Sequence, residues 1–330
     1  MTIRATAPGR TGVIGNPTDM YGGSVLSCTT AERAVCELSD AEVLALSAGY
    51  EDTTIRTKED LTAGGDIFDL SRAVLRGMNI SPDTHRFHLR TETDIPMQAG
   101  LAGSTALVAA IYGAVSAFLG RREAPHEVAE AIRRIEYEQM GVICGFQDQY
   151  MTVFGGLNFM DFRGKGSHLA PDAQPYATVE PLADIIAAPL PFLLANTGVK
   201  HHSGTAHKPV RQRWMDGDTV VIDAYARLAG LARSTKASLW RGDWQAVADA
   251  MNENLHIQQG FGASGEACDR LAEVAMTNGA IGAKLAGAGH GGTVLVLTHE
   301  PERTAQALTD AGAARILHPK PSPGLTVTVD

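Results

Sequence analysis

The apolar and polar positions of the 330-residue chain change period several times, and each change marks a predicted element. Residues 86–92 alternate between apolar and polar, as in a half-buried strand. Residues 104–119 are almost wholly apolar, which predicts a buried helix. Strands are also expected at 3–7 and 24–37, on either side of a turn-rich segment, and a helix at 68–78. The first half of the chain therefore mixes strands and helices.

The same mixture continues to the end of the chain. A helix is predicted at 125–139 and a hairpin at 152–162, and polar, proline-containing sequence at 163–190 weakly interrupts the pattern. The later elements are expected in this order: a strand at 191–196, helices at 209–240, 243–257 and 265–277, strands at 284–287 and 293–297, a helix at 300–311, and a last strand. Because one core stops growing at roughly 250–300 residues, we predict two α+β domains, 1–185 and 186–330.

Composition and charge narrow the classes of protein. The net charge is −9, with 28 basic and 37 acidic side chains, and this excess of acid argues against a nucleic-acid binder. Residues 95–120 carry no charge, but the glycines and proline at their start favour a buried helix over a membrane span. The first residues lack the apolar core of a signal peptide, and four scattered cysteines fit reduced thiols. We therefore expect a cytoplasmic protein without membrane or nucleic-acid partners.

The segment most indicative of chemistry is the glycine loop, defined here as residues 96–106, P-M-Q-A-G-L-A-G-S-T-A. It follows a predicted strand and opens a predicted helix, so backbone N–H groups at the helix start can bind an anion. Gly100 and Gly103 allow close approach, and Ser104 and Thr105 add hydroxyl groups. A plain helix cap with a flexible glycine lead-in remains the alternative.

A second glycine pattern, G-A-G-H-G-G at 287–292, matches the dinucleotide fingerprint but lies before a strand rather than before a helix. We therefore reject a dinucleotide site there and interpret it as another turn that a ligand can approach.

Four segments, in this order, resemble the GHMP kinases, a family that includes galactokinase, homoserine kinase, mevalonate kinase and phosphomevalonate kinase. They are the first glycine segment (7–23), the glycine loop, the segment E-Y-E-Q-M-G-V-I-C-G-F-Q-D-Q-Y (136–150) with its continuation to 159, and the third glycine segment (279–292). The 136–159 segment looks like the sugar-kinase branch with glucuronokinase and heptose-phosphate kinases. The resemblance implies a ribosomal-S5-like N-terminal domain, a C-terminal α+β domain with an antiparallel sheet, and an active site between them.

The resemblance also implies roles for individual residues. Asp148 matches the catalytic base or the electrostatic partner of the attacking hydroxyl, and Arg10 lies near the reacting hydroxyl. Ser104 and Glu136 match the ligands of Mg²⁺, with Glu136 preferred to Glu138. The residues expected to bind ATP and its phosphates are Gly100, Leu101, Ala102, Gly103, Ser104 and Thr105.

The acceptor is expected to contact both the first and the third glycine segments. Residues expected there are Asn16, Asp19, Tyr21, Gly287 and Gly289. Galactokinases carry an acidic residue and a histidine where this chain has Asn16 and Pro17, which argues against galactose.

A basic cluster at 197–213 stands out in an acidic chain. It contains Lys200, Lys208, Arg211, Arg213 and three histidines. We expect Arg211 and Arg213 to bind an anionic group of the acceptor, because a guanidinium can bond both oxygens of a carboxylate or phosphate. A solvated loop is the alternative.

These features predict an ATP- and Mg²⁺-dependent sugar kinase that phosphorylates an anomeric hydroxyl. The acceptor is expected to be an acidic or phosphorylated sugar, with a uronic acid first and a heptose phosphate second. A mevalonate-type alcohol kinase and a non-catalytic sensor of sugar and ATP remain alternatives, and a homodimer is left open.

Overall fold

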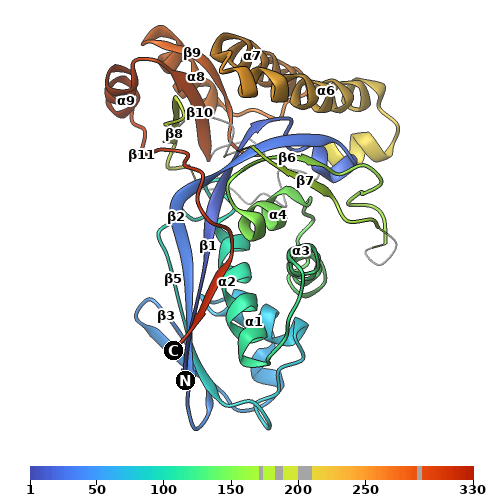
Figure 1. Ribbon diagram of the computed structural model, residues 1–330, viewed down its shortest axis with the longest axis vertical. Helices are drawn as coiled ribbons and strands as arrows, with labels where there is room; N and C mark the ends of the chain where they lie inside the picture. Colours follow the sequence, from blue (N-terminus) through green and yellow to red (C-terminus); the bar gives the residue numbers. More distant parts are fainter. Residues whose placement is uncertain (171–173, 183–188, 200–209, 288–291) are drawn as a thin grey trace.

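A computed structural model describes residues 1–330 except 171–173, 183–188, 200–209 and 288–291. The chain forms two units, each a sheet with helices packed on it (Figure 1). The first unit contains β1 (Thr2–Ile14), η1 (Thr18–Tyr21), β2 (Ser24–Asp40), β3 (Leu44–Ala48), β4 (Glu51–Ile55), η2 (Glu59–Leu61), α1 (Asp69–Gly77), β5 (Phe87–Thr93), α2 (Gly103–Phe118), α3 (Pro125–Arg134), the π-helix η3 (Ile135–Gln139), α4 (Gln147–Phe154), β6 (Leu157–Asp161) and β7 (Thr178–Pro181).

The second unit follows along the chain. It contains β8 (Phe192–Asn196), α6 (Thr219–Arg241), α7 (Trp244–Gly260), α8 (Glu266–Thr277), β9 (Ala280–Leu285), β10 (Thr293–Thr298), α9 (Pro301–Asp310) and β11 (Arg315–Leu317), and the chain ends in β12 (Thr326–Val329). Its sheet has the order β11-β8-β10-β9, and all its pairs are antiparallel. This agrees with the predicted α+β class and the antiparallel C-terminal sheet.

The large sheet is organised around two long strands. The main order is β12-β1-β2-β5-β3-β4, and only β3 and β5 run parallel. Because β2 is 17 residues long, its first part pairs with β6 and its last part with β5. Along β1 and β2, apolar side chains that face the helices are buried, including Ile3, Ala5, Cys36 and Leu38. One face of the sheet therefore lies in the core.

Helix α2 occupies the centre of the first unit. It packs on β1 and β2, and helices α1, α3 and α4 surround it (Figure 1). Most of its residues are buried, because Ala, Gly and Ser allow the helix to lie close to the sheet. The charge-free segment is thus a core helix, as predicted. Among the described residues, no helix is long and apolar enough to cross a membrane.

The two ends of the chain meet in the large sheet. β12 pairs antiparallel with β1, and both termini lie at the same end of the molecule (Figure 1). The chain returns past the first unit, where Pro323 forms a bridge with Gly155. The predicted domain boundary at 185/186 remains a prediction. The last strand, β12, follows the second unit along the chain but belongs to the large sheet of the first unit.

Two predicted elements are wrong in their details. The hairpin at 152–162 does not form, because Thr152–Phe154 complete α4 and only 157–161 form a strand, which pairs with β2. The described part of the predicted helix 209–240 is two helices, at 210–215 and α6. A turn separates them, and Asp218 caps α6 by accepting from the Val220 N–H at 3.0 Å.

The connection after α4 provides a stability test. Gly155 has φ +71°, and a Cβ there would lie 2.1 Å from the Gly324 nitrogen, whereas Gly156 has φ +78° and open space around it. Both Gly→Ala changes cost at least about 1–2 kcal/mol, because both residues have a positive φ that disfavours a side chain. Gly155→Ala should cost a further ~1–3 kcal/mol, because backbone must move.

Urea denaturation of the two variants measures this difference. Equal losses in the free energy of unfolding would mean that the return of the chain past Gly155 is not tightly packed.

Candidate active site

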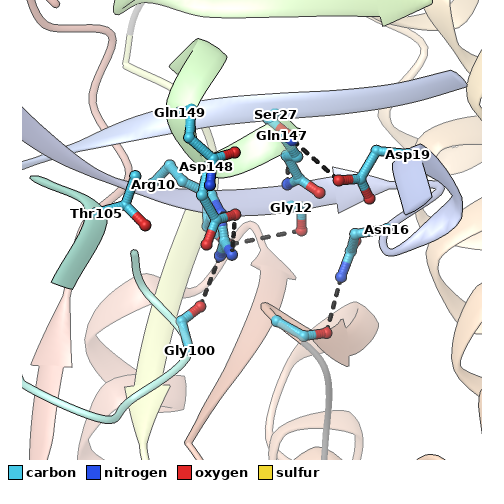
Figure 2. Close-up of polar contacts among 12 residues, drawn as sticks. Arg10, Gly12, Asn16, Asp19, Ser27, Gly100, Thr105, Gln147, Asp148 and Gln149 are labelled. Atoms are coloured by element: carbon cyan, nitrogen blue, oxygen red, sulfur yellow. Dashed lines mark hydrogen bonds and ion pairs between the residues drawn. The ribbon is translucent and has the colours of Figure 1, made fainter. Parts of the chain in front are cut away.

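The centre of the candidate site is the guanidinium of Arg10, which projects from β1 and is buried. Its Nε and Nη2 donate to Oδ1 of Asp148 at 2.8 and 2.5 Å. Its Nη1 donates to the Gly100 carbonyl at 2.6 Å (Figure 2). The same nitrogen also donates to the Ala286 carbonyl at 3.5 Å. One side chain thus joins the glycine loop, the start of α4 and the third glycine segment.

The backbone reinforces this junction. The Arg10 N–H donates to the Leu101 carbonyl at 3.0 Å, and the Gly12 N–H donates to Ala286 at 2.9 Å. A Cβ on Gly287 would lie 2.8 Å from the Gly100 carbonyl oxygen, so only glycine permits this approach of two loops.

The glycine loop has an unusual backbone. Gly100 has φ +72°, and the non-glycine residues Gln98 and Ala102 have φ +57° and +58°. Each such residue stores of order 1 kcal/mol of strain that the surrounding packing must hold. Ala102 is the N-cap of α2, and the loop therefore delivers the first N–H groups of a buried helix to the site.

Next to the start of α2 lies a buried carboxylate. Glu136, from η3, accepts from the Thr105 hydroxyl at 2.7 Å and from the Gln149 amide. Ser104 is half-buried at the first turn of α2, whereas Thr105 is buried and makes the contact. Glu138, the other candidate, is exposed, and the preference for Glu136 as a metal ligand stays a prediction.

Burial determines the titration of this carboxylate. It raises the pKa of Glu136 from 4.5 to about 7, and the nearby Asp148 acts in the same direction, while the Thr105 and Gln149 bonds oppose it. The carbonyl oxygen of the Gln149 amide is buried and has no hydrogen-bond partner within the described residues. A carboxylate oxygen of Glu136 and the amide oxygen of Gln149, both suited to a metal or its bound water, therefore belong to neighbouring side chains.

Asp19 has a contact that its sequence context did not indicate. Its Oδ2 accepts the N–H groups of Phe146 and Gln147 at 2.7 and 2.9 Å, at the start of α4. Burial raises the pKa of Asp19, and these two bonds oppose the rise. Asp19 thus fixes the helix that carries Asp148.

An aromatic group lies beside η1. The ring of Tyr21 stacks on Trp214 with centroids 4.6 Å apart, and it meets Tyr225 at 4.8 Å. Burial raises the pKa of Tyr21 to about 12, although the nearby charge of Arg211 opposes the rise. The Nε of Arg211 is buried without a hydrogen-bond acceptor in the described part of the chain.

The two predicted arginines are in different environments. Arg213 donates to Asp218 at 2.8 Å and to the Phe261 carbonyl at 3.3 Å, so it stabilises the turn before α6. Gly289 and the predicted basic residues Lys200 and Lys208 lie outside the described residues, as do the three histidines of the cluster.

Asn16 is buried and bonds to residues of the second unit. Its amide nitrogen donates to the Gly287 carbonyl at 2.9 Å, and its carbonyl oxygen accepts from Lys284 at 2.7 Å. Sequence reasoning missed Lys284 and Gln149. Gln149 could have been found from its place in Q-D-Q-Y, whereas a lysine within apolar sequence gives no comparable signal.

The comparisons with known proteins agree with this geometry. Residues 69–156 match the model described as GHMP kinases N terminal domain, and residues 232–314 match GHMP kinases C terminal. The chain is 28% identical to glucuronokinase 1 of Arabidopsis thaliana, over 88% of this chain and 83% of the relative. It is also 28% identical to the D-glycero-alpha-D-manno-heptose 7-phosphate kinase of Campylobacter jejuni, over 88% of each.

Its fold is similar to a solved D-glycero-D-manno-heptose 1-phosphate kinase from Bacteroides thetaiotaomicron. The TM-score is 0.75 at 22% identity, and the likeness covers 99% of both chains.

The raised pKa of Glu136 predicts a pH dependence of stability in metal-free buffer. Between about pH 4.5 and 7 the folded protein binds a proton at Glu136 that the unfolded chain has lost. Wild-type stability should therefore fall as pH rises through this window, by on the order of 3 kcal/mol relative to Glu136→Gln.

Urea denaturation at pH 5 and pH 8 measures the effect, with the exposed Glu138→Gln as the matched control. The control should follow wild type. If Glu136→Gln also follows wild type at both pH values, Glu136 is not buried as a carboxyl group.

Proposed function

The chain belongs to the GHMP kinase family, whose members are phosphotransferases that act on a hydroxyl group, and we propose that it is an ATP-dependent sugar kinase whose acceptor carries an acidic group. The observation that carries this proposal is the pair Arg10–Asp148, held against the Gly100 carbonyl of the glycine loop. It joins a carboxylate to the loop that is suited to bind phosphates.

In this mechanism the glycine loop binds the phosphates of ATP through N–H groups at the start of α2. Asp148 orients the acceptor hydroxyl and takes its proton as the γ-phosphoryl group transfers in line. Arg10 holds Asp148 through Oδ1, which leaves Oδ2 for the acceptor, and its charge stabilises the transferring group. Asp19 contributes by anchoring the start of α4.

The residues beside the loop fit Mg²⁺. Glu136 supplies a carboxylate, Ser104 a hydroxyl, and the unpartnered carbonyl of Gln149 can accept from a metal-bound water. Within the described residues, no group of three or more His, Cys, Asp or Glu side chains is placed to hold a metal by itself. When bound, Mg²⁺ would neutralise charge on the phosphates.

The acceptor site is proposed beside the first and third glycine segments. Tyr21 offers an aromatic face for the apolar side of a sugar ring, and Arg211 offers a charge whose Nε is unpartnered among the described residues. Asn16, Gly287 and Gly289 remain proposed contacts with substrate, and the bonds of Asn16 support an indirect role. The names of the 28%-identical relatives, a kinase of glucuronate and one of a heptose phosphate, favour an acidic acceptor.

The function is tested by a coupled assay of ADP release with a panel of glucuronic acid, a heptose phosphate, glucose, galactose and mevalonate. We expect turnover with glucuronic acid or the heptose phosphate. Fastest turnover with mevalonate would support the alcohol-kinase alternative. Tight ATP binding without turnover on any acceptor would support a non-catalytic sensor.

Asp148→Asn should lower kcat by about 10²–10⁴-fold, because the amide cannot take the proton of the hydroxyl. ATP binding, measured by calorimetry, should change little. Asp161→Asn is the matched control, since Asp161, the last residue of β6, pairs with Arg163 just after the strand. More than half of the wild-type kcat in Asp148→Asn would remove Asp148 from the mechanism.

The two arginines predict different effects on the acceptor. Arg211→Ala should raise KM for the acidic acceptor about 10–100-fold, the loss expected for a hydrogen bond to a charged group. It should leave KM for ATP unchanged. Arg213→Ala serves as the control because its guanidinium already pairs with Asp218.

Kinetics with glucuronic acid and glucose measure the preference in each variant. If Arg211→Ala and Arg213→Ala both keep the wild-type preference for the acid, the basic cluster does not select the acceptor.

A further inference from the structure

Lys284, at the end of β9, is fully buried and has no carboxylate partner within the described residues. Its Nζ donates to the Asn16 side-chain oxygen at 2.7 Å, to the Gly12 carbonyl at 3.1 Å and to the Leu285 carbonyl. Buried lysines are rare unless they are paired with an acid. This lysine is thus retained in the interior for its contacts with the first glycine segment.

The three acceptors match the three N–H groups of an ammonium ion, whereas a neutral amine has only two. Burial and the charge of Arg10 lower the pKa of Lys284. The three hydrogen bonds therefore have to offset the cost of burying an ammonium ion. All three acceptors are neutral oxygens, and two of them belong to the first glycine segment.

The contact continues from Lys284 to the glycine loop. Because the carbonyl of Asn16 accepts from Lys284, the amide nitrogen of Asn16 points to the Gly287 carbonyl. Gly287 in turn lies against Gly100, with no room for a Cβ. Gly12 must be glycine for the same reason, since a Cβ there would lie 2.3 Å from the Asn16 side-chain oxygen.

A second contact supports the same turn from α7. The Gly15 N–H donates to the Asn254 side-chain oxygen at 2.9 Å, the Asn254 amide donates to Gln258 at 2.9 Å, and the Gln258 amide donates to the backbone carbonyl of Asn16 at 3.3 Å. These side chains are buried. Residues of the second unit therefore hold the turn at two places, through α7 and through Lys284. Of these two described contacts, the one with Lys284 continues to Gly287.

We propose that Lys284 is a positioning residue of the phosphoryl transfer, which acts through Asn16 to hold Gly287 against Gly100 of the glycine loop. Gly100 also accepts from Arg10, which binds Asp148. Lys284 thereby sets the spacing between the bound phosphates and the carboxylate that orients the acceptor. The inference rests on the proposed function for its kinetic consequence, but the coupling to the glycine loop is independent of it.

The kinetic test compares Lys284→Met, Asn16→Ala and the double variant, with kcat normalised to the fraction of protein that binds nucleotide. Misplacement of a site by about 1 Å can cost ~10²-fold in rate. Lys284→Met is expected to lower kcat about 10–100-fold and to change KM for the acceptor less than about 3-fold. The double variant should lose no more than the worse single variant, because Lys284 acts through Asn16.

Lys236→Met is the matched control, since Lys236 on α6 pairs with Glu180 on β7 and has no contact with Asn16 or Gly287 among the described residues. It should keep the wild-type kcat. An unchanged normalised kcat in Lys284→Met, even with a lower Tm, would reduce Lys284 to a stabilising residue. Losses that multiply in the double variant would show that the two residues act separately.

Hydrogen exchange tests the coupling without any substrate. Lys284→Met should raise exchange at 12–17 and in the glycine loop, and Lys236→Met should not. If Lys284→Met does not fold, Asn16→Ala replaces it, because it removes the link to Gly287 and leaves Lys284 its Gly12 and Leu285 acceptors. Unchanged exchange in the glycine loop overturns the proposal whether or not the wild type phosphorylates a sugar, whereas a wild type without turnover counts against the proposed function alone.

Discussion

The buried guanidinium of Arg10 is the contact on which the rest of the site depends. A single side chain on β1 donates to Asp148, Gly100 and Ala286, which come from three distant parts of the chain. A charge this well buried needs such acceptors, because removing it from water costs several kcal/mol. The fold therefore brings the glycine loop, α4 and the third glycine segment to the same point, and the carboxylate that orients a hydroxyl lies beside the loop suited to phosphates.

Further buried polar contacts hold each of these parts in place. Asp19 anchors α4 through the Phe146 and Gln147 N–H groups, and Glu136 joins η3 to Thr105 at the start of α2. Lys284 joins the first glycine segment to the third. Each group is satisfied by uncharged partners, namely backbone groups, side-chain amides or the Thr105 hydroxyl. This makes the arrangement specific, since a misplaced partner would leave a buried ionisable group unsatisfied.

The sequence predicted the parts of the fold that depend on local pattern. The strand at 86–92, the helix at 104–119 and the small antiparallel sheet follow from periodicity and from the resemblance. The sequence pattern gave the wrong element where tertiary contacts determine the secondary structure. Thr152–Phe154 have the β-branched and aromatic residues of a strand, yet they complete α4. For the site, the resemblance pointed to Arg10, Asp148 and Glu136, which the fold brings close together. The contact partners Gln149 and Lys284 were missed: Gln149 lies within Q-D-Q-Y, whereas the role of Lys284 depends on contacts with a distant part of the chain.

The most direct measurement is a crystal structure of the protein with Mg²⁺, a non-hydrolysable ATP analogue and glucuronic acid. The γ-phosphate is expected at the N–H groups of the glycine loop, with an acceptor hydroxyl between it and Oδ2 of Asp148 and the carboxylate near Arg211. A nucleotide bound away from the glycine loop, or an acceptor whose hydroxyls do not reach Asp148, would contradict a phosphoryl-transfer site built on Arg10.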